Sequence, residues 1–289
     1  MQNGMLVPDS PVNRMARMAG GAFGVDGGPD LDMTKILRFE AKEANSVVGF
    51  DGGGVDRFDL NYSTDGRTWK KWPFENGDHG DITLTNVGDN VWVRGVNPTW
   101  KENIYNAGDC FVFKQGNIKI GGTVQSLIDG TGETDTAVCM AYLFAGFDWA
   151  HNTVVTEVEE GLLPATNLVE YCYGYMFQNC DNLVNTPSLP AAVLQPNCYY
   201  GMFEHSGIRS IVLPATELVS KCYVNLVRNC ADITHVTCLA TSGITYSYPD
   251  GNLFGWMLGV GASGTFVKKA GVTYPSDAIP SGWTIEDVD

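Results

Sequence analysis

The chain of 289 residues is poor in basic side chains: 18 lysines and arginines stand against 33 aspartates and glutamates, for a formal net charge of −15. Nucleic-acid binding depends on lysine and arginine that neutralise phosphates, and anionic membrane surfaces attract the same residues. We therefore expect neither nucleic acid nor membrane as a partner. No apolar run approaches the ~20 residues of a membrane helix. Residues 1–10 also lack the basic and apolar segments of a secretion signal.

The sequence is equally poor in patterns that mark an active site. It has four histidines, none of them in a zinc-protease motif, and no Gly-x-Ser-x-Gly elbow that would present a nucleophilic serine. Asp148 and His151 are close in sequence but have no nucleophile with a supporting motif beside them. We interpret the acidic residues 157–160 as a solvated face. The prediction is therefore no catalytic residue, no cofactor and no enzyme activity.

Metal-binding patterns are weak as well. No Cys-x-x-Cys pair occurs among the eight cysteines, which argues against a zinc site. Asp51, Asp56 and Asp59 flank a glycine-rich loop and offer the carboxylate oxygens that calcium prefers. Their spacing matches no EF-hand loop, so we expect an ordinary glycine loop and no metal.

Residues 1–33 differ in composition from the rest of the chain. They hold five of the nine methionines, and glycines are frequent between residues 20 and 28. Such a segment cannot bury enough apolar area to order itself alone. A disordered tail and an anchoring arm that orders on a partner protein both remain open, and we favour the arm. Its predicted anchoring residues are Met5, Leu6, Val7, Met15, Met18 and Phe23.

Residues 34–130 consist of short alternating segments separated by turn signals. Segments such as 37–41, 58–62 and 91–94 place apolar residues on one face of a strand. Six to eight strands at a spacing of 8–12 residues predict an antiparallel β-sandwich. We interpret the dense aromatic residues as core, with a carbohydrate-stacking platform as the alternative for any that are exposed. These residues are Trp69, Trp72, Phe74, Trp92 and Trp100.

Residues 131–250 contain an internal repeat. Leu-Pro-Ala recurs with prolines at 164, 190 and 214, and a Cys-Tyr pair follows each copy. Two copies carry Met-Phe four residues after the cysteine. A period near 25 is that of a leucine-rich-repeat solenoid. The predicted repeat core consists of Cys172, Met176, Phe177, Cys198, Met202, Phe203 and Cys222.

Each repeat is expected to form a short strand around Leu-Pro and then a turn or helical segment. On a helix the cysteine and the apolar pair share one face that points inward. Because equivalent positions stack on one another, we expect buried, unpaired thiols. Residues 251–289 are expected to form a terminal cap over the apolar end of the stack.

The repeat Leu-Pro-Ala-Thr-x-Leu…Cys-Tyr-x-x-Met-Phe resembles the BspA-like class of leucine-rich repeats, which is abundant in surface proteins of gut Bacteroidales and in the phages that infect them. The resemblance includes residues 62–69 and the closing residues 263–284, and it covers about residues 35–289 but not the arm. His205-Ser206 departs from the Asn-Cys that ends the other copies, and Leu226-Val227 departs from Met-Phe. The class implies binding and display rather than catalysis.

The expected fold is therefore mainly β: an extended N-terminal arm (1–33), an antiparallel β-sandwich (34–130), a short leucine-rich-repeat α/β solenoid (131–250) and a cap (251–289). The resemblance implies a virion structural protein of a tailed, crAss-like phage, acting as a head fibre, a capsid decoration or a tail-associated protein.

Made in the host cytoplasm and displayed on the particle exterior, it would bind phage capsid or tail proteins through residues 1–33. Its repeat domain would bind a host-surface glycan or protein, and a homo-oligomer, most simply a trimer, is expected. The alternative is a secreted or surface-displayed bacterial adhesin. That alternative predicts a cleavable signal or a lipobox cysteine, and residues 1–33 show neither pattern.

Overall fold

A computed structural model describes residues 31–52, 57–74, 79–101, 108–146 and 150–289. The chain divides into two units, Met1–Leu31 and Asp32–Asp289, and the second is described here. It is mainly β, with a short α-helix, α2 (Ser126–Asp129), and a short 3-10 helix, η2 (Glu160–Leu162). In the described ranges, no helix has the length and apolar character needed to cross a bilayer.

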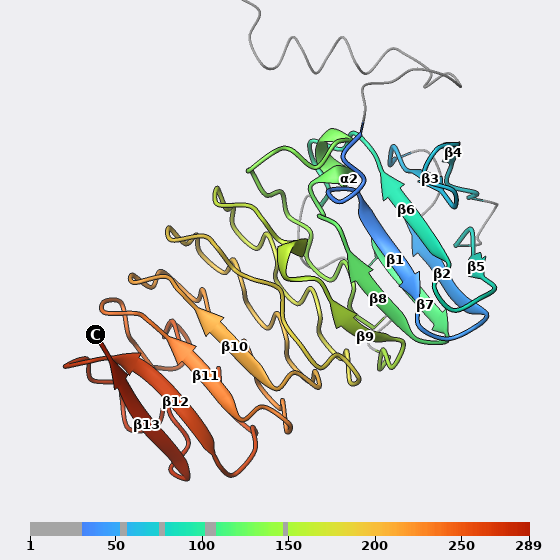
Figure 1. The fold of residues 1–289 in the computed structure, drawn as a ribbon. Helices are drawn as coiled ribbons and strands as arrows, with labels where there is room; N and C mark the ends of the chain where they lie inside the picture. The colour runs from blue at the N-terminus through green and yellow to red at the C-terminus, as the bar shows by residue number, and fades with distance from the viewer. Residues whose placement is uncertain (1–30, 53–56, 75–78, 102–107, 147–149) are drawn as a thin grey trace, which may run out of the picture. The chain divides into compact units, whose positions relative to one another are not determined.

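Two sheets form the first part of this unit (Figure 1). One has the strand order β4-β3-β6-β1-β8-β9 and the other β5-β2-β7. The strands are β1 (Leu37–Ala41), β2 (Ser46–Asp51), β3 (Asn61–Ser63), β4 (Lys70–Lys71), β5 (Ile82–Leu84), β6 (Asn90–Arg94), β7 (Cys110–Gln115), β8 (Ile118–Gly121) and β9 (Val155–Val158). The pairs among β1 to β8 are antiparallel, as the turn signals between these segments predict.

Aromatic side chains fill the space between these two sheets. Leu37, Phe39 and Ala41 alternate with less buried residues along β1, because successive side chains of a strand point to opposite faces. The ring of Phe39 meets that of Phe111 on β7, with centroids 4.7 Å apart, and Phe50 on β2 lies 5.1 Å from Phe111. The inner faces of the sheets therefore share one core.

The first part of the unit is joined to the repeats through a shared sheet. Strand β8 pairs in parallel with β9, so the boundary expected at residue 130 lies inside one compact unit with a continuous core. Glu159, at the end of β9, lies against Gly121, 2.5 Å from Arg38 and 3.3 Å from Lys119. Glu157 and Glu160 are exposed, as expected for a solvated face, whereas Glu159 is partly buried and is bound by two basic residues at the sheet surface.

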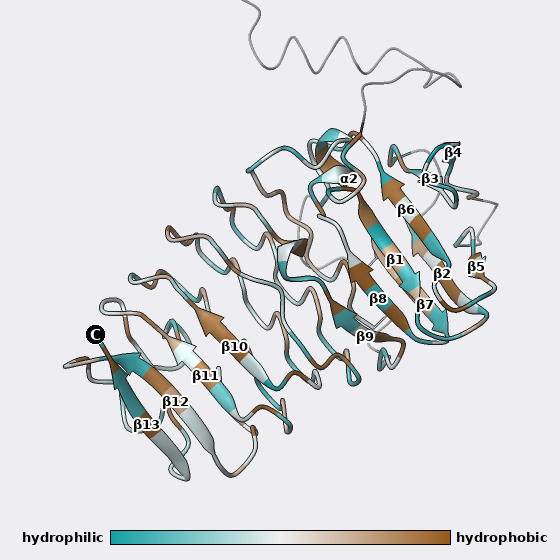
Figure 2. Ribbon diagram, in the orientation of Figure 1, coloured by the Kyte–Doolittle hydropathy of each residue, from teal (hydrophilic) through white to brown (hydrophobic). Residues whose placement is uncertain are grey.

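The repeats stack as successive coils of the chain. We number them coil 1 (137–146 and 150–162), coil 2 (163–188), coil 3 (189–212), coil 4 (213–238) and coil 5 (239–268). Coils 3 to 5 contribute β10 (Ser210–Leu213), β11 (His235–Cys238) and β12 (Gly264–Lys269), which continue into β13 (Trp283–Val288) as a parallel sheet. Figure 1 shows these four strands side by side, and β10 is among the most hydrophobic in Figure 2.

Among the described residues, the strand expected beside each Leu-Pro is present in some repeats and absent from others. β10 ends directly before Pro214, whereas the described residues 183–190 have no assigned strand. Residues 251–289, expected to be a cap, add two strands to the parallel sheet. Ile285 on the last of these strands is 51% exposed although its register partner Phe266 is fully buried.

The segment after each Leu-Pro, like the equivalent segments of coils 1 and 5, is a ribbon of turns. We call residues 139–146, 172–180, 198–206, 222–230 and 252–260 the turn ribbon. In coil 2 the N–H groups of Tyr173 and Tyr175 donate to the next coil, at Cys198 O (3.0 Å) and Tyr200 O (2.7 Å). The intervening N–H groups, such as that of Gly174, donate three residues back. An α-helix needs every N–H for its own i−4 carbonyl, so the expectation that cysteine and apolar pair share a helical face is wrong.

Every fourth residue of the turn ribbon in coils 2 to 5 is left-handed. Tyr175 and Asn179 have φ of 55° and 60°, and their equivalents in coil 3, Gly201 and His205, have 58° and 58°. The result is an alternation of two residues inward and two outward. Asparagine and histidine tolerate this conformation better than most residues, which explains why His205 can stand where the other copies have asparagine. Ser206 then takes the inward cysteine position, 3.5 Å from the Cys230 thiol.

Candidate functional site

The predicted anchoring residues lie outside the described residues: these are Met5, Leu6, Val7, Met15, Met18 and Phe23. The predicted repeat-core residues all lie in the interior, and each is 0% exposed: these are Cys172, Met176, Phe177, Cys198, Met202, Phe203 and Cys222. No ligand can reach these seven side chains, so their part in function is to hold the coils together.

The thiols of the repeats have the properties of unreactive cysteines. All eight cysteines are unpaired, and only Cys139 is less than fully buried. Burial raises the pKa of the Cys172 thiol to about 12, and it raises the pKa of Cys198 and Cys222 as well. A reactive cysteine needs a lowered pKa and access to solvent. These thiols therefore pack as small apolar groups.

Aromatic ladders make the coils a rigid scaffold. The rings of Phe144, Phe177 and Phe203 stack through coils 1 to 3 with successive centroids 5.4 Å apart. Tyr173, Tyr199 and Tyr223 form a second ladder at 6.1 Å spacing. Because well-packed interiors resist deformation, side chains on the outer surface of the coils are held at fixed spacing.

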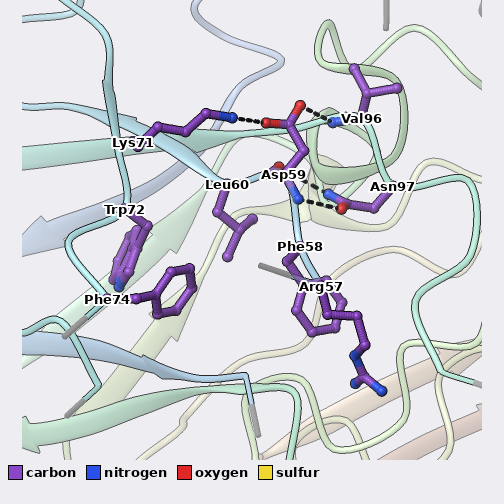
Figure 3. A pocket seen from close by; sticks show the side chains of 9 residues that line it. All are labelled: Arg57, Phe58, Asp59, Leu60, Lys71, Trp72, Phe74, Val96 and Asn97. Atoms are coloured by element: carbon purple, nitrogen blue, oxygen red, sulfur yellow. Dashed lines mark hydrogen bonds and ion pairs between the residues drawn. The ribbon is translucent and has the colours of Figure 1, made fainter. Parts of the chain in front are cut away.

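One pocket of about 490 Å³ opens beside β3 and β4. Figure 3 shows its lining residues: Arg57, Phe58, Asp59, Leu60, Lys71, Trp72, Phe74, Val96 and Asn97. The Asp59 carboxylate pairs with Lys71 and accepts the Val96 N–H at 3.2 Å, while its backbone N–H donates to the Asn97 side chain at 2.9 Å. The Asp59 carboxylate and the Lys71 ammonium therefore bind each other, and the Asn97 amide binds the backbone of Asp59.

The pocket gives little support to a calcium site or to a carbohydrate-stacking platform in this region. Asp59, a candidate calcium ligand, is committed to Lys71, and Asp56 lies outside the described residues. Trp72 and Trp100 are each 3% exposed and belong to the core, as expected. The other three aromatic residues, Trp69, Phe74 and Trp92, are partly exposed.

Two of the histidines each contact one polar side chain. His151 contacts Asp181 at 2.8 Å on an exposed surface, and its supposed neighbour Asp148 is outside the described residues. His205 Nε2 lies 2.9 Å from Asn229 Nδ2. Among the residues that the structure describes, no three His, Cys, Asp or Glu side chains gather in a way that could hold a metal ion.

The outer face of the turn ribbon gathers a polar and aromatic group that sequence reasoning missed. Tyr142 stacks on Tyr175 with centroids 4.8 Å apart, and Tyr200 follows at 5.3 Å from Tyr175. Beside these rings, Gln178 Nε2 donates to Glu204 Oε2 at 3.0 Å, and Arg228 lies 3.5 Å from Oε1 of the same carboxylate. Burial is the main cause that raises the pKa of Glu204, which is 7% exposed.

A signal for this group exists in the sequence. Gln178, Glu204 and Arg228 all stand six residues after a repeat cysteine, at positions 172, 198 and 222. Only the tertiary structure shows that these three side chains contact one another, with Gln178 and Glu204 nearly buried and the Arg228 side chain 40% exposed. Comparisons of the chain with protein-family models, with curated proteins and with solved structures find no match.

Proposed function

We propose that the chain is a virion structural protein of a tailed phage, displayed as a head fibre, capsid decoration or tail-associated protein. In this proposal residues 34–130 form an antiparallel β-sandwich and residues 131–250 a leucine-rich-repeat solenoid. Residues 1–33 attach to capsid or tail proteins, and the solenoid surface binds a host-surface glycan or protein.

The observation that carries this proposal is the difference in exposure between repeated and variable residues of the coils. The repeated cysteines, tyrosines and phenylalanines are buried and unreactive, whereas side chains that vary between coils, such as Val193 and His205, are exposed. A scaffold of this kind displays side chains at fixed positions, which suits recognition. The acidic net charge of −15 favours protein and glycan partners over phosphate-rich ones.

The sheet in which β8 pairs with β9 adds support for a display role. Because β8 and β9 pair, the first part of the unit and the coils are joined by backbone hydrogen bonds rather than by a flexible linker. The first part of the unit and the repeats therefore form one compact unit. A trimer is the simplest oligomer in the proposal, since several linked arms bind at a high effective concentration and closed rotational symmetry is usual.

The test is incorporation into particles. A host expressing the tagged chain would be infected with the phage that carries its gene, and gradient-purified particles would be analysed by quantitative mass spectrometry. The tagged chain is expected in the particles, and a matched chain lacking residues 2–31 is expected to be absent from them. Recovery of both chains only from the bacterial surface would overturn the proposal in favour of the adhesin.

A further inference from the structure

We infer that the outer face of the turn ribbon over coils 2 to 4 is a saccharide-binding site, centred on Tyr175, Tyr200, Gln178, Glu204 and Arg228. The inference rests on the proposed display function and names the face and the ligand class. It assigns recognition to the turns rather than to the exposed side of the parallel sheet.

The first argument is that the fold does not require these polar residues. The position of Gln178, Glu204 and Arg228 is occupied by Ala145 in coil 1 and by Leu258 in coil 5. The Arg228–Glu204 pair, 3.5 Å apart and with the Arg228 side chain 40% exposed, contributes little to stability. The concentration of amide, carboxylate and guanidinium in the three middle coils therefore calls for an explanation outside folding.

The second argument is hydrogen-bonding capacity. The Arg228 Nε atom is buried and has no hydrogen-bond partner in the described structure, and its guanidinium approaches Glu204 at 3.5 Å. A buried donor left without a partner is costly. The exposed part of the Arg228 guanidinium, on a side chain that is 40% exposed, can donate to a ligand hydroxyl beside Glu204.

The third argument is the combination of side-chain types. Saccharides present hydroxyls, which need paired donors and acceptors, and apolar C–H faces, which pack on aromatic rings. Arg228 and Glu204 supply the first, with Gln178 bound to Glu204. The half-buried ring of Tyr200 supplies the second, beside Tyr175, one face of which is covered by Tyr142. A protein partner would instead need a desolvated apolar centre. The strongly exposed large apolar residues, such as Val193, Val212 and Ile285, lie outside this group.

The backbone holds this face in a fixed geometry. Tyr175 and Asn225 are equivalent left-handed residues, each with φ of 55°, and the coils beneath them are linked by backbone hydrogen bonds. Tyr175 also lies over Gly201, where an added Cβ would approach its ring to 2.5 Å. Rigid placement lowers the entropic cost of binding a flexible glycan.

The test uses the purified full chain and immobilised neutral polysaccharides: mannan, galactan, glucan and chitin oligomers. Binding to at least one is expected. Glu204→Gln, which keeps the shape, and Tyr175→Asn, which matches Asn225, should each weaken it at least about tenfold. Glu217→Gln, at an exposed position, and His235→Ala, on the exposed side of β11, are the matched controls and should bind as the parent chain does.

Three results would overturn the inference. These are no binding to any polysaccharide, equal binding by the Glu204 and Tyr175 variants, or loss of binding in His235→Ala, which would place recognition on the sheet. Persistent binding to cells whose glycans were removed by periodate would also overturn it, in favour of a protein partner. Because this assay contains no particles, its outcome is independent of whether the chain is found in virions.

Discussion

The ring of Phe177 lies parallel to that of Phe203 in the next coil, with centroids 5.4 Å apart and an interplanar angle of 2°. Both side chains are 0% exposed, so each coil closes the apolar surface of the one before it. Phe203→Ala should therefore lower the free energy of unfolding by about 3–5 kcal/mol. Urea denaturation measures the change, and Val193→Ala, at a position 71% exposed, is the control that should stay within about 0.5 kcal/mol. Equal effects of the two variants would contradict a stacked core.

Substitutions at two glycines distinguish the loss of stability caused by backbone strain from the loss caused by steric crowding. Gly201 (φ 58°) and Gly271 (φ 74°) are both left-handed, but an added Cβ meets the Tyr175 ring only at Gly201. Gly271→Ala should cost about 1–2 kcal/mol of stability from backbone strain alone. Gly201→Ala should cost more in the same denaturation experiment. The excess should shrink in a Tyr175→Gly background, and an unchanged excess would show that Tyr175 is not its source.

The cysteines should resist modification in the native protein. An alkylating reagent such as iodoacetamide reacts with thiolates, and burial raises the pKa of Cys172 to about 12. Intact-mass measurement should show slow labelling confined to Cys139, the one cysteine that is not fully buried, and complete labelling of all eight after unfolding. Rapid native labelling of Cys172, Cys198 or Cys222 would mean that the coils open.

Stability should decline at alkaline pH. The ordinary pKa of a cysteine thiol is 9.0, and that of Cys172 in the folded protein is raised to about 12. Unfolded thiols lose protons that the native state retains, so this contribution is complete below pH 9 and is lost as the pH rises towards about 12. Urea midpoints measured from neutral pH to about pH 10 should fall.

A triple variant tests the source of that decline. Cys172→Ala, Cys198→Ala and Cys222→Ala together remove three raised thiols, so the decline above pH 9 should be shallower although the starting stability is lower. A decline as steep as that of the parent chain would assign the effect to other groups, among which the buried tyrosines also have raised pKa values.

Removal of residues 2–31 should leave the rest of the chain folded. Asp32–Asp289 forms a compact unit with its own core, so the deletion should leave the thermal unfolding temperature within a few degrees of the parent value. Circular dichroism and light scattering would check this. Aggregation of the shortened chain would show that the first 31 residues cover part of that core.

Some features of this protein follow from its sequence alone. The alternation in residues 37–41 and 91–94 depends only on the period of a strand, and β1 and β6 occupy those ranges. The recurrence of Leu-Pro-Ala and Cys-Tyr at steps near 25 requires equivalent environments. The repeated cysteines and aromatics accordingly stack in the interior.

Other features were decided only by the tertiary structure, because they depend on contacts between residues far apart in the chain. The N–H of Tyr173 donates to a carbonyl 25 residues further on, and no local pattern distinguishes this ribbon from a helix. The left-handed backbone that follows from these bonds brings Gln178, Glu204 and Arg228 together beside Tyr175, with Arg228 the most exposed of the three. The pairing of β8 with β9 likewise joins two segments of different sequence character, because strand pairing depends on backbone groups that all residues except proline share.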